Sequence, residues 1–555
     1  MNTIIKNKYA GIILVIIVAA LFRLFAIGAV PYGIANDEAS YIISGYTIAH
    51  NGGVDIARKF LPLSINLDSS LSPVPVYLIS LFTAFSLSPL TARLPFALLG
   101  IGIVVLVYFL ALEMFKNRLI ALFAGLLLSL SSWQILVTRT VWDVIPAQFF
   151  YLLGLYIFLK KIKKGSVLWS LPAFLLGFFS YHGTKVFFAF FLLLLFGLYG
   201  KALFKRKKEF SFFVVGIIAI FALFGYVTIT QSVTRQQEII FTNPAVLKEA
   251  AKKVEFDRAR SSAPEFLKKI ESNKLTFFAE KMTASYLTAF SSNFLVTVGD
   301  IHPLFGYGVF FKGVLYLIDI PFLFLGIVYL VTKSKFSSAA KTEENNNYRN
   351  ALFLVGGGLL ISPLPSTLAS GYSYFIRSFM MSPFFALIIG VGCFVLYKYS
   401  FTLKSFRKPF LVTLVIVYAL YVLRFCYQYY FQLNTYGSEY WNGSSRQISE
   451  YILNNYQRFD RIIVVTSEDK IFLQYALASH ATPAQLQTAW EKNWPVQFDK
   501  VSFENNCLKG SELKARLAPH TLYIVSDGCS VDRRPVKEIL DPMESLRVLW
   551  RLYET

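Results

Sequence analysis

Residues 9–30, YAGIILVIIVAALFRLFAIGAV, form an apolar run that is interrupted by a single charge, Arg23. A run of about 18 or more mostly apolar residues can cross a bilayer as a helix. This one is too long for a removable leader and lacks its small-residue cleavage pattern, so it predicts a retained membrane helix. The next residues, 31–41, read PYGIANDEASY and place Asp37 and Glu38 just beyond the membrane. Two adjacent carboxylates there are costly without a purpose, so they indicate a site that binds a cation or removes a proton.

The rest of the chain repeats the apolar pattern. Apolar residues make up 55% of the sequence and aromatic residues 17%, and they occur in long blocks. Such blocks predict an α-helical multi-pass membrane protein with about eleven spans. The candidate spans are 9–30, 92–115, 119–137, 144–159, 166–181, 185–200, 211–232, 305–332, 351–369, 374–397 and 409–431.

The net charge of +21 is concentrated in short loops that alternate along these spans. Lys and Arg in alternate short loops are typical of the cytoplasmic side of a membrane protein. We therefore expect a plasma-membrane protein with a cytoplasmic N-terminus and an extracytoplasmic C-terminus. The bilayer, rather than nucleic acid, explains the charge. Segments 31–91, 233–304 and 433–555 are then the large exterior parts.

Two domains are expected, a membrane domain over 1–432 with exterior loops 31–91 and 233–304, and an exterior α/β domain over 433–555. In the latter, 448–455 has the pattern of a helix, and 461–466 and 521–526 have that of buried strands. The apolar run 78–85 is too short to span and predicts an interfacial helix. Cys507 and Cys529 lie on the exterior side, where a disulfide persists. Both a bridge and two free thiols remain open.

The turn between spans 166–181 and 185–200 contains His182 and Lys185. Each span, at about 24 Å of helix, is shorter than a hydrocarbon core of about 30 Å. We therefore expect the turn to be recessed below the outer surface. Ionisable groups at such a depth are functional candidates by default. The alternative is that Lys185 extends to the interface.

Cationic side chains recur at the outer ends of the spans. Guanidinium groups bind phosphate bidentately and remain charged in a low dielectric. As a set, these residues predict a phosphate-binding bowl, although any one of them can be an interfacial anchor, and Arg139 can pair with Asp143. The set is Arg58, Lys59, Arg93, Arg139, Lys185 and Arg377. We find no His/Cys metal-ligand spacing and no phosphate-binding P-loop in the sequence.

Several short motifs occur in order along residues 1–430. They are Asp37-Glu38-Ala39 with Tyr41, Ser72 to Tyr77 (SPVPVY), Arg93 to Gly100 (RLPFALLG), Ser132-Trp133, Thr138-Arg139, Tyr181-His182, and Pro363-Leu364-Pro365 leading to Arg377. This order resembles the GT-C membrane glycosyltransferases. Within that superfamily it is most similar to the bacterial type of the protein O-mannosyltransferase and aminoarabinose-transferase branch.

The resemblance implies an inverting glycosyltransferase that moves a monosaccharide from a polyprenyl-phosphate donor to an acceptor hydroxyl on the outer face of the membrane. It implies that Asp37 acts as the base, while Glu38 orients the acceptor or helps to bind a divalent cation. No cofactor is assigned, and the acceptor is a glycan, a lipid or a protein.

The phosphate of the donor is expected to contact Arg58, Lys59, Arg93, Arg139, His182, Lys185 and Arg377. Tyr41, Asp143 and His302 are candidates on the acceptor side or in the exterior loops. Asp143 stands four residues after Arg139, whereas eukaryotic members usually place the acid at five, so the role of Asp143 is open.

Two other hypotheses remain. A transporter or flippase of lipid-linked sugars also has many spans and intramembrane charges, but inverted repeats are expected in it, and we see none in the sequence. A non-catalytic assembly subunit would tolerate substitution of both Asp37 and Glu38.

Overall fold

The computed structural model describes residues 9–555 except 68, 164, 231–237, 300–307, 310–311, 337–342, 372–373, 467–470, 492–494, 508–518, 530 and 532. The chain divides into two compact units. The first contains residues 1–25, 96–139 and 143–425, and the second contains 26–95, 140–142 and 426–555. The segment 31–91 thus groups with the C-terminal part of the chain, and the domain boundary expected at 432/433 remains a proposal.

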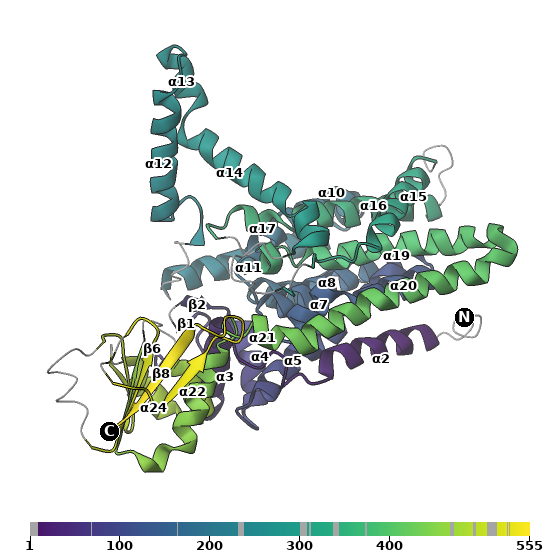
Figure 1. Cartoon of the computed structure of the whole chain (residues 1–555). Helices are drawn as coiled ribbons and strands as arrows, with labels where there is room; N and C mark the ends of the chain where they lie inside the picture. Colours follow the sequence, from purple (N-terminus) through teal and green to yellow (C-terminus); the bar gives the residue numbers. More distant parts are fainter. Residues whose placement is uncertain are drawn as a thin grey trace. The chain divides into compact units, whose positions relative to one another are not determined.

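The first unit is helical. Helix α15 packs against α19, α19 against α6, and α10 against α16 (Figure 1). Its elements are α2 (Ala10–Leu24), α5 (Pro89–Phe115), α6 (Arg118–Leu130), α7 (Ser132–Thr138), α8 (Val144–Lys161), η1 (Val167–Ser170), α9 (Leu171–Phe178), α10 (Thr184–Phe204), α11 (Lys207–Thr230), α12 (Pro244–Ala259), α13 (Glu265–Glu271), α14 (Lys274–Thr288), η3 (Asn293–Thr297), α15 (Asp319–Phe336), α16 (Glu343–Ile361), α17 (Leu364–Thr367), α18 (Tyr374–Arg377), α19 (Met381–Tyr399), η4 (Ser400–Phe406) and α20 (Arg407–Tyr427). Helices α5 and α20 continue into the second unit.

Six helices of the described residues are long and apolar enough to cross a membrane, or seven if the bent pair α6 and α7 is one span. The chain is therefore a multi-pass membrane protein, but the expected number of eleven spans is not confirmed. Three differences account for much of the gap. Helix α2 has only 15 residues. Helices α6 and α7 meet at 58°. Two expected spans also lie in one helical stretch, Met381–Tyr436.

The expected pair of short spans is only partly observed. Helix α9 has 8 residues and follows the short η1, but α10 has 21 residues, starting at Thr184. A helix of 21 residues is about 32 Å long, which matches a hydrocarbon core. The expected short length was therefore wrong for α10, and the recessed position of the turn stays a prediction.

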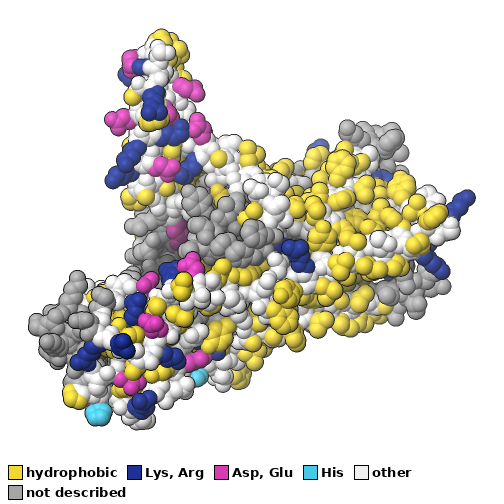
Figure 2. All heavy atoms as spheres, in the orientation of Figure 1, with side chains coloured by type: hydrophobic (Ala, Val, Ile, Leu, Met, Phe, Trp, Pro, Cys, Tyr) yellow, Lys and Arg dark blue, Asp and Glu magenta, His cyan; other side chains and the backbone are white. Residues whose placement is uncertain are grey.

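Apolar side chains gather over the spanning helices, as Figure 2 shows. On α20, Val415, Leu420 and Leu423 are among the exposed large apolar residues. Charged side chains instead gather over the arm formed by α12, α13 and α14 (Figure 2), where Lys281 pairs with Glu249 at 2.8 Å. The segment 233–304 thus contains this helical arm.

The second unit combines helices with a mixed sheet. Helix α3 (Asn36–His50) packs against α4 (Pro73–Thr83) and α23. The other elements are β1 (Ile65–Leu67), β2 (Ser69–Leu71), η5 (Gln428–Gln432), α21 (Leu433–Tyr436), α22 (Gly443–Asn454), η6 (Tyr456–Arg458), β3 (Arg461–Val465), α23 (Ile471–Ala478), α24 (Pro483–Glu491), β4 (Val496–Phe498), β5 (Val501–Glu504), β6 (Thr521–Ser526), β7 (Lys537–Leu540) and β8 (Val548–Glu554).

The six-stranded sheet has the order β4-β5-β3-β6-β8-β7. Strand β3 pairs in parallel with β5 and β6, and the outer strands are antiparallel. Central parallel strands are buried on both faces, which explains the continuous apolar runs in β3 and β6. Both strands lie where the sequence predicts them. The short antiparallel pair β1 and β2 forms a separate sheet within residues 31–91.

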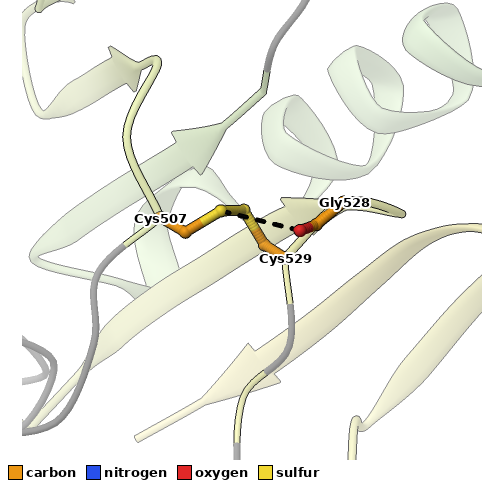
Figure 3. The surroundings of a disulfide bond; sticks show 3 residues. All are labelled: Cys507, Gly528 and Cys529. Atoms are coloured by element: carbon orange, nitrogen blue, oxygen red, sulfur yellow. Dashed lines mark hydrogen bonds between the residues drawn. A yellow bond between two sulfur atoms is a disulfide. The ribbon is translucent and has the colours of Figure 1, made fainter.

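A disulfide joins Cys507 to Cys529, and the Sγ of Cys507 lies 3.9 Å from the carbonyl oxygen of Gly528 (Figure 3). Cys529 is buried in a cluster with Val465 and Tyr523, and Cys507 packs against that cluster. The bridge therefore attaches the chain after β5 to the core of the sheet.

Candidate active site

The first turn of α3 carries both carboxylates. Ala35 precedes the helix in an extended conformation, and Asp37 and Glu38 follow Asn36. Carboxylates are stabilised at this end of a helix by its unpaired N–H groups and dipole. Adjacent helical residues point about 100° apart, so the two acids face different surroundings. Asp37 is exposed, whereas Glu38 is fully buried.

Glu38 forms a bidentate ion pair with Arg93. The Nε and Nη2 of Arg93 donate to the two carboxylate oxygens at 2.7 and 3.0 Å, and both side chains are completely buried. The backbone N–H of Val141 also donates to this carboxylate, at 3.3 Å. The carboxylate of Glu38 is therefore buried and hydrogen-bonded inside the protein, and it is not available to a substrate.

Arg93 uses every donor of its guanidinium group. Besides Glu38, it donates to the carbonyl oxygens of Ile27 at 3.3 Å, Pro31 at 2.8 Å and Gly33 at 2.7 Å. A guanidinium has five N–H groups, and all five are occupied. This leaves no donor for a phosphate, so the structure gives Arg93 a different role from the predicted one. It holds the segment before α3 in place.

Side chains from the C-terminal part of the second unit bind the same segment. The amide nitrogen of Asn442 donates to the carbonyl of Ile34 at 2.8 Å and to the Asn36 side chain at 3.0 Å. Gln474 donates to the same carbonyl at 2.9 Å. The turn that presents Asp37 is thus held by the residue that precedes α22 and by a residue of α23.

Further contacts complete this attachment. Arg446 donates to the carbonyl of Tyr32 and stacks on its ring, with 4.1 Å between the guanidinium carbon and the ring centre. A Cβ on Gly33 would lie 1.8 Å from the carbonyl oxygen of Trp441, so only glycine fits there. These contacts restrict the backbone of residues 30–36 to one conformation.

The other predicted residues of this unit are more exposed. Arg58 forms an ion pair with Glu491, with 2.5 Å between Nε and Oε1. Lys59 is exposed, and its backbone N–H donates to Asp55 at 2.7 Å. Tyr41 is buried, and its hydroxyl accepts from the Ser72 N–H at 3.4 Å. Of these, Lys59 most readily offers a cation to solvent.

The remaining basic candidates belong to the first unit. Nζ of Lys185 lies 3.3 Å from Nδ1 of His182 and 4.8 Å from the ring centre of Phe224. The structure therefore brings the side chains of His182 and Lys185 together, while their binding of phosphate stays a prediction. Arg377 donates to the carbonyl of Gly371 at 3.0 Å and lies 4.0 Å from Glu238.

Arg139 and Asp143 are buried in the first unit. Nη1 of Arg139 donates to the carbonyls of Phe22 and Arg23 at 3.0 and 3.2 Å. His302 lies outside the described residues. Among the described residues, no group of three or more His, Cys, Asp or Glu side chains is arranged to hold a metal ion.

The structure thus assembles Asp37, Glu38 and Arg93 in one unit and His182 with Lys185 in the other. A bowl that includes both sets remains a prediction. Sequence reasoning missed the roles of Asn442, Gln474 and Arg446, because nothing in their local sequence points to a segment about 400 residues earlier. The resemblance to family motifs ended near residue 430 and offered no signal there.

No protein-family model matches the sequence, and no curated protein matches it. The fold is similar to several solved structures. One is ArnT from Cupriavidus metallidurans bound to undecaprenyl phosphate, with a TM-score of 0.49, 11% identity and 98% of each chain covered.

The archaeal oligosaccharyltransferase AglB from Archaeoglobus fulgidus, in complex with an inhibitory peptide and a dolichol-phosphate, has a TM-score of 0.44 and 13% identity over 85% of this chain and 63% of that chain. The apo oligosaccharyltransferase of the same organism has a TM-score of 0.43 and 12% identity over 86% and 65%. The chain spans less than two thirds of both oligosaccharyltransferase chains. Since each TM-score is below 0.5, the functional proposal rests on the residues of this chain.

Proposed function

We propose that the protein is an inverting glycosyltransferase that uses a polyprenyl-phosphate sugar as donor and Asp37 as general base. The observation that carries this proposal is the division of the acid pair. Glu38 forms a buried ion pair with Arg93. Asp37 is exposed on the same helical turn and has no hydrogen bond or ion pair to the described residues. A free carboxylate on a fixed backbone is what a base requires.

In this mechanism, Asp37 accepts the proton of an acceptor hydroxyl as its oxygen attacks the anomeric carbon. The bond between that carbon and the phosphate oxygen breaks, and the electron pair leaves with polyprenyl phosphate. One displacement inverts the anomeric configuration. Polyprenyl phosphate is a good leaving group, so the main demand on the protein is to stabilise negative charge with preorganised cations.

For that electrostatic role we propose His182, Lys185, Lys59 and Arg377, with Arg58 less available because of Glu491. Arg93 and Glu38 act instead as positioning residues. We expect Asp143 and Tyr41 to support the structure near the site, and the sugar and the acceptor remain to be identified.

The test is transfer of radiolabel from a polyprenyl-phosphate sugar by the full chain in lipid nanodiscs. Asp37→Asn should lower the rate by about 10²–10⁴-fold, the usual contribution of a general base. Because Asp37 has no partner among the described residues, the variant should fold normally. A matched control is Glu255→Gln, which changes an exposed acid on α12.

Full transfer by Asp37→Asn would overturn the assignment of the base. Movement of the labelled lipid across the bilayer without transfer to any acceptor would instead support the transporter hypothesis.

A further inference from the structure

A cavity of about 350 Å³ opens within the second unit. Its lining includes the aliphatic side chains of Ile42 on α3, Leu87, Leu453 on α22 and Leu477 on α23. Sites for small molecules are typically about 300–1,000 Å³, mostly apolar, with a few polar groups that set orientation. The cavity has that size and that composition, and it contains none of the residues assigned to catalysis.

The polar lining of the cavity carries little net charge. It consists of Ser86, Ser88, Arg446, Glu450, Gln474 and His480. Nε of Arg446 lies 2.9 Å from Oε1 of Glu450, so the cation is paired. An anionic group placed here would meet the Glu450 carboxylate as well as the arginine. The site therefore suits a polar group with hydrogen-bonding capacity and no net charge.

An exposed apolar strip, made of Leu81, Phe85 and Leu90, flanks in the sequence one segment of the cavity lining. Residues 86–89 line the cavity, and the large apolar residues on either side of them are exposed: Phe85 by 87% and Leu90 by 49%. Leu81 on α4, four residues before Phe85, is exposed by 65%. Leu90 belongs to α5, a helix long enough to span the membrane.

Since α5 is long and apolar enough to cross a membrane, Leu90 in its first turn lies at one end of that candidate span. Exposed apolar side chains beside a pocket with polar groups fit a molecule with an apolar chain and a polar head. Such molecules are supplied in abundance by the bilayer itself.

We propose that this cavity binds a bilayer lipid whose head group carries no net charge. The head group occupies the end formed by Arg446, Glu450 and Gln474, and the acyl chain follows Leu87 out to the strip of Leu81, Phe85 and Leu90. The proposal does not depend on the proposed glycosyl transfer. A lipid bound here would contact Arg446 and Gln474, which also donate to the carbonyls of Tyr32 and Ile34 in the segment before Asp37.

The test uses the full chain in nanodiscs that contain a phosphatidylethanolamine with a diazirine in one acyl chain. After illumination, cross-links should map to the peptides that contain residues 81–90 and 446–480. Ala478→Trp fills the cavity and should lower cross-linking at these peptides about tenfold, equivalent to about 1.4 kcal/mol of binding free energy. Leu420→Trp, at an exposed position on α20, is the matched control and should change nothing there.

Unchanged cross-linking at these peptides in a folded Ala478→Trp protein would overturn the lipid site. If that variant does not fold, Ser86→Trp at the exposed wall of the cavity serves the same purpose. Equal or stronger labelling by the matching phosphatidylglycerol would overturn the assignment of a head group without net charge.

Discussion

At the scale of single residues, Asp37 and Glu38 differ because they point in different directions from one helical turn. Glu38 turns inward and meets Arg93, while Asp37 turns outward. A buried carboxylate is tolerated only when it is paired and hydrogen-bonded. The pair of Glu38 and Arg93 therefore stabilises the fold around the start of α3. It also gives the two neighbouring carboxylates different roles, one structural and one available to a substrate.

Removing one partner of this buried pair should be strongly destabilising. Glu38→Gln leaves the charge of Arg93 buried and uncompensated, which costs about 3–5 kcal/mol. The matched control is Glu491→Gln, which breaks the exposed pair with Arg58 and should cost at most about 1 kcal/mol. Thermal unfolding in detergent, followed by intrinsic tryptophan fluorescence, measures both. Equal effects of the two substitutions would contradict the role given to the pair.

Asp55 gives a pH-dependent prediction at the same scale. Burial raises the pKa of Asp55 above its ordinary 3.8, against the opposing effect of the N–H groups of Lys59 and Ala57. The folded protein thus binds this proton more tightly than the unfolded chain. The associated stability is fully present below pH 3.8 and is lost as the pH rises through the raised pKa.

Asp55→Asn cannot ionise but keeps an oxygen acceptor for the Lys59 N–H. Relative to the wild type, it should therefore gain stability on going from pH 4 to pH 7. Unfolding of both proteins at the two pH values measures this difference. A relative loss of stability by the variant over that range would show that the carboxylate is stabilising when ionised.

At the scale of elements, local sequence was enough to predict β3 and β6, since continuous apolar runs are typical of central parallel strands. It was less reliable for spans, because the breaks in the apolar helices depend on their neighbours. The bend between α6 and α7 is an example: Ser131 accepts from Gln134 N–H at the start of α7. A hydrogen bond of this kind is invisible in a hydropathy count.

The Cys507–Cys529 bridge closes a loop with a sequence separation of 22 residues. Replacing both cysteines by serine should destabilise the sheet by about 3 kcal/mol, chiefly because the unfolded chain regains its freedom. Limited proteolysis of the C-terminal part, with and without a reductant, measures the effect. Cys393→Ser, which changes a free thiol, is the control. Identical digestion of the wild type with and without reductant would contradict a structural role for the bridge.

At the scale of the whole molecule, residues 26–95 and 426–555 form one compact unit. The contacts are specific, as when Gln487 of α24 donates to the carbonyl of Asp55 at 2.9 Å. The C-terminal part therefore stabilises the segment that presents Asp37, through side chains such as Asn442 and Gln474.

Removal of residues 433–555 should consequently disorder the segment 31–91. We expect rapid protease cleavage within 31–91 in the purified truncated protein and none in the full chain, together with loss of transfer. Expression and membrane insertion, measured by fractionation, serve as controls. A truncated protein with a protected loop and normal transfer would show that the loop is ordered without the C-terminal part.

The sequence by itself determined the membrane character of the chain, the acid pair after the first apolar run, and the central strands of the sheet. These features depend on local composition and periodicity, which act within a few turns or strands. Only the tertiary structure decided that Glu38 is paired, that Arg93 has no donor left for a phosphate, and that Asn442 and Gln474 hold Ile34 across separations of 408 and 440 residues. Those outcomes depend on which groups lose water together when distant segments pack, and no local pattern encodes that choice.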